Sequence, residues 1–300
     1  MTRLVLLMVL VMSSFSVKAD ELKLHLLRSP VGINWKSPWN LSVSTLKNNI
    51  IPFKNKRAFA ISHVFVEVKC DSTGEHIYRG MTSAPAEPGN SEVDMLFKKG
   101  YGLGMMFHTY PGLYEKNEVV TRDLAPYLGS KRYSSLTIKV NPAACQRMMD
   151  YAHDFEARGF GKKYAGLQGD PLKGDGSGCS AFGVSFMRVA GLMDSFTKEW
   201  QQIIDVPTRF VGGEITGKKV KLTYILKSIR ARWNNKEPHI HLEAWDPELM
   251  HAWVKRTYQQ VKWGEYQGQW PAEISKHRKS YHLTLDMSDR ATPTGSFWLF

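Results

Sequence analysis

The sequence predicts an α+β fold in which an antiparallel sheet packs on a helix that carries a cysteine. In residues 63–69, Val64, Val66 and Val68 alternate with larger or polar side chains, which is the period of a strand with one apolar face. A turn, "DSTGE", and a second strand, "HIYRGM", complete a predicted hairpin. Further along, the glycine-rich "GDGSG" leads into "CSAFGVSFMRVAGLM", an apolar run with helical spacing that Cys179 opens.

The first element, residues 1–19, predicts a secretory signal peptide. It has a positive start, an unbroken apolar run over 4–12, and Val17 and Ala19 at positions −3 and −1 of a cut before Asp20. The apolar run is too short to span a membrane, and no later run reaches about 18 apolar residues. We therefore expect an exported protein, periplasmic or extracellular, with no transmembrane segment after cleavage.

Composition predicts a folded core and an anionic partner. Hydrophobic residues make up 43% of the chain and aromatic residues 12%, enough to build a core. The net charge is +12, or about +10 once Arg3 and Lys18 are removed with the signal peptide. On an exported protein this charge favours an anionic cell-wall polymer or lipid surface. No zinc-finger or RNP-type spacing occurs, so we expect no nucleic-acid partner.

The three cysteines leave at least one thiol unpaired in an oxidising compartment. Cys70 ends the first predicted strand and Cys145 begins a predicted helix, so a bridge between them is one option. Cys179 is then the free thiol. The glycine-rich loop before it gives access, and the helix start favours the thiolate and presents backbone N–H groups to an oxyanion. These features predict a nucleophile.

A base for this thiol must come from the ten histidines. His63 begins the predicted hairpin, whereas His239 and His241 share one face of a later strand. The pair on one strand could chelate zinc, but no further ligand accompanies it, so we expect no metal and no cofactor. Asp246 and Pro247 then begin a helix as N-cap and first helical residue.

The segment from Tyr164 to Phe186, "YAGLQGDPLKGDGSGCSAFGVSF", resembles the nucleophile segment of NlpC/P60-type papain-like cysteine hydrolases. "SHVFVEVKC" is similar to the histidine-led strand of their circularly permuted branch, in which the histidine hairpin precedes the cysteine helix. "GMT" and "GCSAFGVSF" also resemble motifs of a family of exported bacterial proteins within it. The resemblance covers about residues 57–193.

This resemblance implies a papain-like core with Cys179 as nucleophile, His63 as base, and Gly178 and Tyr164 at the oxyanion site or cleft. The sequence departs from the family pattern at two positions. Gly178 stands where the pattern has aspartate, and Ala181 stands where it has glycine.

The third polar residue, which orients the histidine in such enzymes, is open between Thr82, Glu67 and His76. Hairpin pairing places His76 beside Lys69, about 20 Å along the strand from the histidine, and Glu67 about 13 Å away. Thr82 would lie across from His63.

In the unpermuted branch of such enzymes the histidine follows the cysteine, which offers an alternative base. This order pairs Cys179 with His239, and His251 follows twelve residues later. The helix start at Asp246 interrupts the hairpin that this spacing requires, so we prefer His63.

The predicted organisation is a signal peptide at 1–19, a catalytic core with its lead-in at 20–193, and a C-terminal α/β extension packed on the core at 194–300. Within the extension, residues 216–233 are rich in lysine. Their alternation predicts a strand with one cationic face that suits the anionic partner.

Together these features predict an exported cysteine hydrolase or acyltransferase that acts on an amide or ester bond. Cell-wall peptide is the first expected substrate and lipid acyl chains the second. The alternative is a non-catalytic binding or structural protein of the envelope, built on a degenerate papain-like core.

Overall fold

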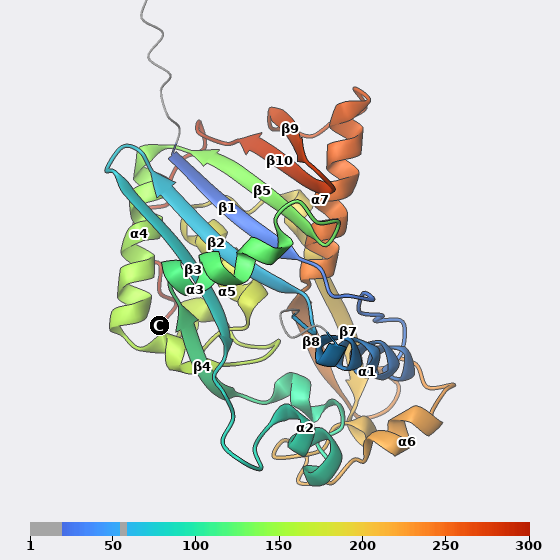
Figure 1. Cartoon of the computed structure of the whole chain (residues 1–300). Helices are drawn as coiled ribbons and strands as arrows, with labels where there is room; N and C mark the ends of the chain where they lie inside the picture. Colours follow the sequence, from blue (N-terminus) through green and yellow to red (C-terminus); the bar gives the residue numbers. More distant parts are fainter. Residues whose placement is uncertain (1–19, 55–58) are drawn as a thin grey trace, which may run out of the picture.

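A computed structural model describes residues 20–54 and 59–300, and the predicted signal peptide lies outside these residues. The main sheet has eight strands in the order β6-β4-β3-β2-β1-β5-β10-β9 (Figure 1). Neighbouring strands are antiparallel except β5 and β10. The fold is therefore the mixed α+β type that the sequence predicts. The strands are β1 Asp20–Leu27, β2 His63–Cys70, β3 Glu75–Ser83, β4 Tyr110–Glu115, β5 Tyr133–Val140, β6 Lys163–Tyr164, β9 Ala272–His277 and β10 Ser280–Asp286.

Two further strands form a separate ribbon, and the helices cover the sheet and this ribbon. The ribbon strands are β7 Gln201–Pro207 and β8 His239–Trp245. The α-helices are α1 Pro38–Lys54, α2 Glu92–Asp94, α3 Asn117–Leu124, α4 Pro142–Ala157, α5 Cys179–Val189, α6 Leu222–Lys227 and α7 Pro247–Lys262.

The predicted hairpin is β2 and β3, with Lys69 opposite His76 as the turn position requires. Because side chains alternate along a strand, one face of the sheet is almost wholly aliphatic. That face forms the main core with α4, α5 and α7. Its fully buried members include Leu24, Val66, Leu136, Leu283 and, on the helices, Tyr151, Phe155, Phe182 and Phe186.

The other face of the sheet is polar and aromatic, and α3 crosses part of it (Figure 1). Val120 and Leu124 of this helix pack on Leu27, Phe65 and Tyr133. His63 belongs to this second face, although it lies at the first position of its strand. Because His63 lies at the end of the strand, its side chain can interact with Cys179 at the start of α5.

A second core lies at the end of the molecule where β2 begins. It joins α1, the ribbon, α6 and a 3₁₀ turn at Leu103–Phe107. The strand predicted within 216–233 is wrong, since residues 222–227 form the short helix α6. Leu222 and Ile225 are both buried at helical spacing, and their burial against this core determines the local structure.

The chain after residue 193 contributes both to the ribbon and to the main sheet. β10 pairs with β5, and α7 packs on the same apolar face as α5. Asp246 caps α7 and Pro247 is its first residue, as predicted. The aromatic tail packs on α4, where the ring centroids of Phe297 and Tyr151 lie 5.6 Å apart.

Cys70 and Cys145 form a disulfide that ties the end of β2 to the first turn of α4. The Cα atoms lie 5.7 Å apart and the bridge closes a sequence separation of 75. Cys179 is the free cysteine. Within the described ranges, no helix combines the length and apolar character needed to span a membrane.

Candidate active site

Helix α5 begins at Cys179. Close packing around the preceding residue, Gly178, explains why glycine stands at this position. Gly178 is the N-cap in extended conformation, with φ −80° and ψ 163°. A Cβ at this position would lie 2.1 Å from the carbonyl oxygen of Gly166, so no larger residue fits without moving that loop. Since Gly178 has no side chain to cap the helix, the first-turn N–H groups remain free for the sulfur and for a substrate oxygen.

His63 lies where β2 has separated from β3. The last pair between the two strands is Phe65 with Gly80, and β3 continues beyond it to pair with β4. The backbone N–H groups of Val64 and Ser180 help to hold the pKa of the Cys179 thiol below its usual value. The imidazole of His63 reaches the same sulfur from the end of its strand.

Cys179 and His63 shift each other's pKa in the direction of an ion pair. Burial alone would lower the pKa of His63, but the neighbouring Cys179 and Glu115 raise this pKa to about 10. Burial would likewise raise the pKa of the thiol, yet the His63 charge and hydrogen bond hold it below its usual value. The two shifts act in the same direction, and both favour the thiolate–imidazolium form over the neutral pair.

Glu115, at the end of β4, is the third polar residue of the site. Its Oε2 lies 3.8 Å from Nε2 of His63, and both side chains are only 4% exposed. These two atoms are buried, and neither has a hydrogen-bond partner among the described residues. Because Nε2 faces the carboxylate, Nδ1 is the ring nitrogen left to face the sulfur.

Aromatic rings hold the imidazole in place. Phe59 stacks on His63 with centroids 4.6 Å apart and an interplanar angle of 6°. The backbone N–H of Phe59 donates to the hydroxyl of Tyr127 at 2.7 Å. Phe65 meets the ring edge to face at 4.4 Å. Cys179 itself is 6% exposed, so the thiolate is shielded from bulk water.

Tyr164, predicted at the cleft, does lie at the sulfur. It belongs to β6, which pairs with β4 through Tyr110. The backbone and the side chain of Cys179 both affect the pKa of the Tyr164 hydroxyl. Burial and the thiolate charge raise the pKa of Tyr164 well above its usual value, so it stays protonated and can donate.

The three candidates for the orienting residue lie elsewhere. Glu67 accepts hydrogen bonds from His76 at 2.8 Å and from His25 at 3.0 Å, in a polar network further along β2. Thr82 pairs with Leu113 of β4, since β3 has left β2 at this point. The carboxylate that faces His63 is that of Glu115 instead. Glu115 follows His63 by 52 positions and lies outside the predicted hairpin.

The alternative histidines do not join Cys179. His239 is on the ribbon, where its Nδ1 donates to the carbonyl of Glu237 at 2.8 Å. His251 is buried on α7, with Ser134 Oγ at 2.9 Å from its Nδ1. His241 contacts two carboxylates, Asp205 and Glu243. Across residues 20–54 and 59–300 no group of three or more histidine, cysteine or acidic residues is arranged to hold a metal ion.

Comparison with protein-family models, with curated proteins and with solved structures finds no match for this chain. A thiolate at a helix start, an imidazolium beside it and a carboxylate behind the imidazolium are the components of nucleophilic acyl transfer.

Proposed function

We propose that the protein is an exported cysteine hydrolase or acyltransferase on a permuted papain-like core. One observation carries the proposal: the free thiol of Cys179 is paired with His63, and His63 in turn faces Glu115. The order of these residues along the chain, histidine before cysteine, agrees with the permuted arrangement. Export is inferred from the signal peptide predicted over residues 1–19.

The first chemical step is attack of the Cys179 thiolate on the carbonyl carbon of an amide or ester. A carbon–sulfur bond forms while the carbonyl oxygen takes the negative charge. His63 then gives its proton to the leaving nitrogen or oxygen as the carbon–heteroatom bond breaks, which leaves a thioester. In the second step water or an acceptor hydroxyl attacks this thioester, and His63 takes the proton as Cys179 leaves as a thiolate.

The start of α5 supplies donors for the oxyanion. The candidate donors are the first-turn backbone N–H groups and the protonated hydroxyl of Tyr164, whose pKa responds to Cys179. Donors that are already fixed before the reaction stabilise the developing charge without reorganisation. Glu115 keeps the imidazole oriented and favours its protonated form.

The basic charge supports an anionic partner, either a cell-wall polymer or a lipid surface. The lysine-rich segment lies at one end of the molecule, on and around α6 (Figure 1). Tyr224 and Ile229 are exposed there among the cations, with 48% and 61% of their surface accessible. Such a mixture suits an anionic interface.

Thiol labelling tests the proposed function. Iodoacetamide at pH 7 should alkylate Cys179 rapidly in the folded, oxidised protein, and His63→Ala should slow this reaction while His239→Ala leaves it unchanged. Peptide mapping identifies the labelled residue. A folded wild-type protein whose Cys179 reacts no faster than an ordinary thiol would instead favour the non-catalytic binding protein.

A further inference from the structure

The end of the molecule around α6 carries a surface on which exposed apolar side chains lie among cations. We call this surface the α6 face, and it consists of residues 95–100 and 213–232 (Figure 1). The two segments are neighbours in space, because the backbone N–H of Val220 donates to the carbonyl of Gly100 at 2.6 Å. A Cβ on Gly100 would lie 3.0 Å from that of Lys219. The two segments therefore form one continuous region.

The α6 face is strongly cationic. It holds eight lysines and arginines, all exposed, and one carboxylate, that of Glu214. The eight cations are Lys98, Lys99, Lys218, Lys219, Lys221, Lys227, Arg230 and Arg232. Within the described chain one of them has an ion-pair partner, since Lys98 pairs with Asp94. Glu214 itself faces His108, with Oε2 3.5 Å from Nδ1. Most of the positive charge is therefore left for an anionic partner.

Large apolar side chains protrude among these cations. Phe97 is 59% exposed and Ile215 is 48% exposed, in addition to Tyr224 and Ile229 described above. Aliphatic and aromatic side chains of this size gain free energy when they leave water. Exposed apolar groups that gather on one region mark a site of interaction. The α6 face therefore offers two kinds of contact, charge and apolar surface.

Ile229 shows how closely the two kinds of side chain are mixed. It lines a hollow of about 480 Å³ together with Arg209, Lys227 and Arg230. Among the described residues, Arg209 is the one of these cations that has a carboxylate partner, with Glu237 at 3.2 Å. A soluble anionic polymer would use the cations alone. A bilayer offers anionic headgroups to the cations and an apolar interior to Ile229.

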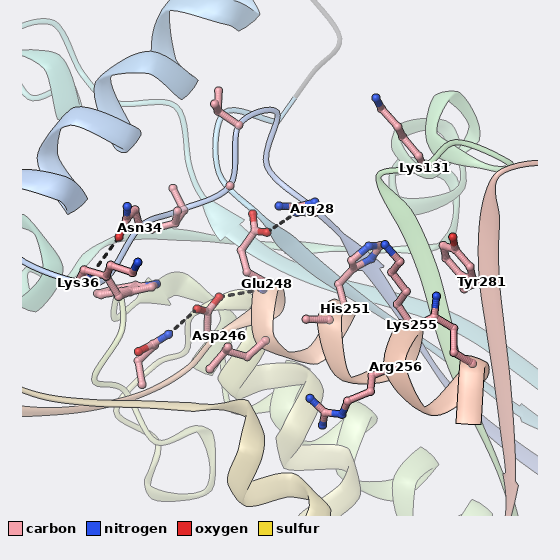
Figure 2. Close-up of a pocket in the computed structure, with 18 residues that line it drawn as sticks. Arg28, Asn34, Lys36, Lys131, Asp246, Glu248, His251, Lys255, Arg256 and Tyr281 are labelled. Carbon is pink, nitrogen blue, oxygen red and sulfur yellow. Dashed lines mark hydrogen bonds and ion pairs between the residues drawn. The ribbon is translucent and has the colours of Figure 1, made fainter. Parts of the chain in front are cut away.

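The cations of a second region show the contrast. A cleft of about 1020 Å³ between the loop after β1 and α7 is also lined by lysines and arginines (Figure 2). There the fold engages several of them itself. Arg28 Nε lies 2.7 Å from Oε2 of Glu248, and Nζ of Lys255 lies over the ring of Tyr281, 5.8 Å from its centroid. The cleft is thus partly neutralised by its own side chains, unlike the α6 face.

We infer that the α6 face docks on an anionic lipid bilayer, with its cations at the headgroups and with Phe97 and Ile229 inserted below them. The inference rests on the proposed function, whose partner is either a cell-wall polymer or a lipid surface, and it selects the lipid. The face lies at the end of the molecule where β2 begins, and His63 is the first residue of β2. Docking therefore turns the end that carries His63 toward the membrane.

Sedimentation with vesicles tests the docking. The protein is the mature chain from Asp20 with Cys179→Ala, so that neither the apolar signal segment nor turnover contributes. Vesicles that contain phosphatidylglycerol should bind it, and vesicles of phosphatidylcholine alone should bind it far more weakly. Phe97→Ser with Ile229→Ser should weaken binding to the anionic vesicles by at least about tenfold, because two apolar side chains no longer leave water. Binding to heparin, an anionic polymer without an apolar interior, should stay unchanged in this variant.

The matched control removes one aromatic and one aliphatic side chain outside the α6 face. Trp263→Ser with Ile203→Ser serves here, since these side chains are 62% and 57% exposed, and it should keep the parent's binding. The inference is overturned if the parent binds heparin but not anionic vesicles, which would select the polymer. It is also overturned if the Phe97 and Ile229 variant binds vesicles as tightly as the parent, or if the control loses as much. Cys179 labelling is scored separately in wild-type protein, so failure of either result leaves the other standing.

Discussion

The carboxylate of Glu115 reaches His63 diagonally, across a strand that carries no side chain between them. Gly80 of β3 pairs with Phe65 on one side and with Glu115 on the other. A Cβ at residue 80 would lie 2.6 Å from Oε2 of Glu115 and 2.7 Å from Cδ1 of Phe65. The missing side chain is therefore what lets the carboxylate approach the imidazole to 3.8 Å.

The first prediction separates two glutamates on the same face of the sheet. Glu115→Gln should slow alkylation of Cys179 at pH 7, because the imidazolium loses the carboxylate that orients and favours it. Glu67→Gln should leave alkylation unchanged and reduce stability, since Glu67 holds His25 and His76. Rates of iodoacetamide labelling and urea unfolding curves measure the two effects, and equal labelling losses in both variants would contradict it.

Gly80→Ala is expected to damage the site through packing. The added methyl displaces either the carboxylate or the Phe65 ring, at a cost of about 1–3 kcal/mol of unfolding free energy. Cys179 labelling should slow in the same variant. Gly74→Ala is the control, because Gly74 has a positive φ but nothing lies within 4 Å of its Cβ position. This variant should lose stability through backbone strain, while the rate of Cys179 labelling stays unchanged.

The pH dependence of labelling should reflect the ion pair. Because the pKa of the Cys179 thiol is lowered, the midpoint of the labelling rate should lie at a lower pH than for a free thiol. In His63→Ala the midpoint should move to alkaline pH, because burial then acts alone on the thiol. An unshifted profile in the variant would show that His63 does not control Cys179.

The raised pKa of His63 also makes the free energy of unfolding depend on pH. The pKa of His63 is raised in the folded state to about 10, so its stabilising contribution is fully present below its unfolded value of 6.5. This contribution is lost as the pH rises through about 10. Urea unfolding of wild type and His63→Gln from pH 6 to 10.5 should show the gap between them shrink with increasing pH.

Tyr164→Phe should separate turnover from reactivity. Loss of one oxyanion donor is expected to lower hydrolysis of a nitrophenyl ester at least about tenfold. Alkylation of Cys179 involves no oxyanion, so labelling should change far less. A parallel loss of both rates would assign Tyr164 to thiol activation instead.

Binding to an anionic surface should depend on salt and on the segment around α6. Sedimentation with phosphatidylglycerol vesicles and with purified cell wall should weaken strongly from 0.15 to 1 M salt, as the Debye length shortens from about 8 to 3 Å. Lys218→Gln with Lys221→Gln should reduce the binding, and Cys179→Ala should not. Absence of binding at low salt would contradict the proposal that the protein binds an anionic surface.

The local elements could be predicted from the sequence because their determinants lie close together along the chain. Alternating valines and a turn give the β2–β3 hairpin and its register, and Asp246 with Pro247 begins α7. A glycine-rich approach and an apolar helical run put Cys179 at the start of α5. These are short-range patterns whose physical causes act within a few residues.

Only the tertiary structure decided which polar group stands behind His63. Glu115 lies 52 positions later in the sequence and reaches the imidazole because two strand pairings bring it there and Gly80 leaves the space. Tertiary contacts also favour α6 over the strand predicted within 216–233, since Ile225 of this helix joins a core built by distant segments. By itself the sequence determined the thiol, its helix and the strand of the histidine, whereas long-range strand pairing decided which carboxylate faces that histidine.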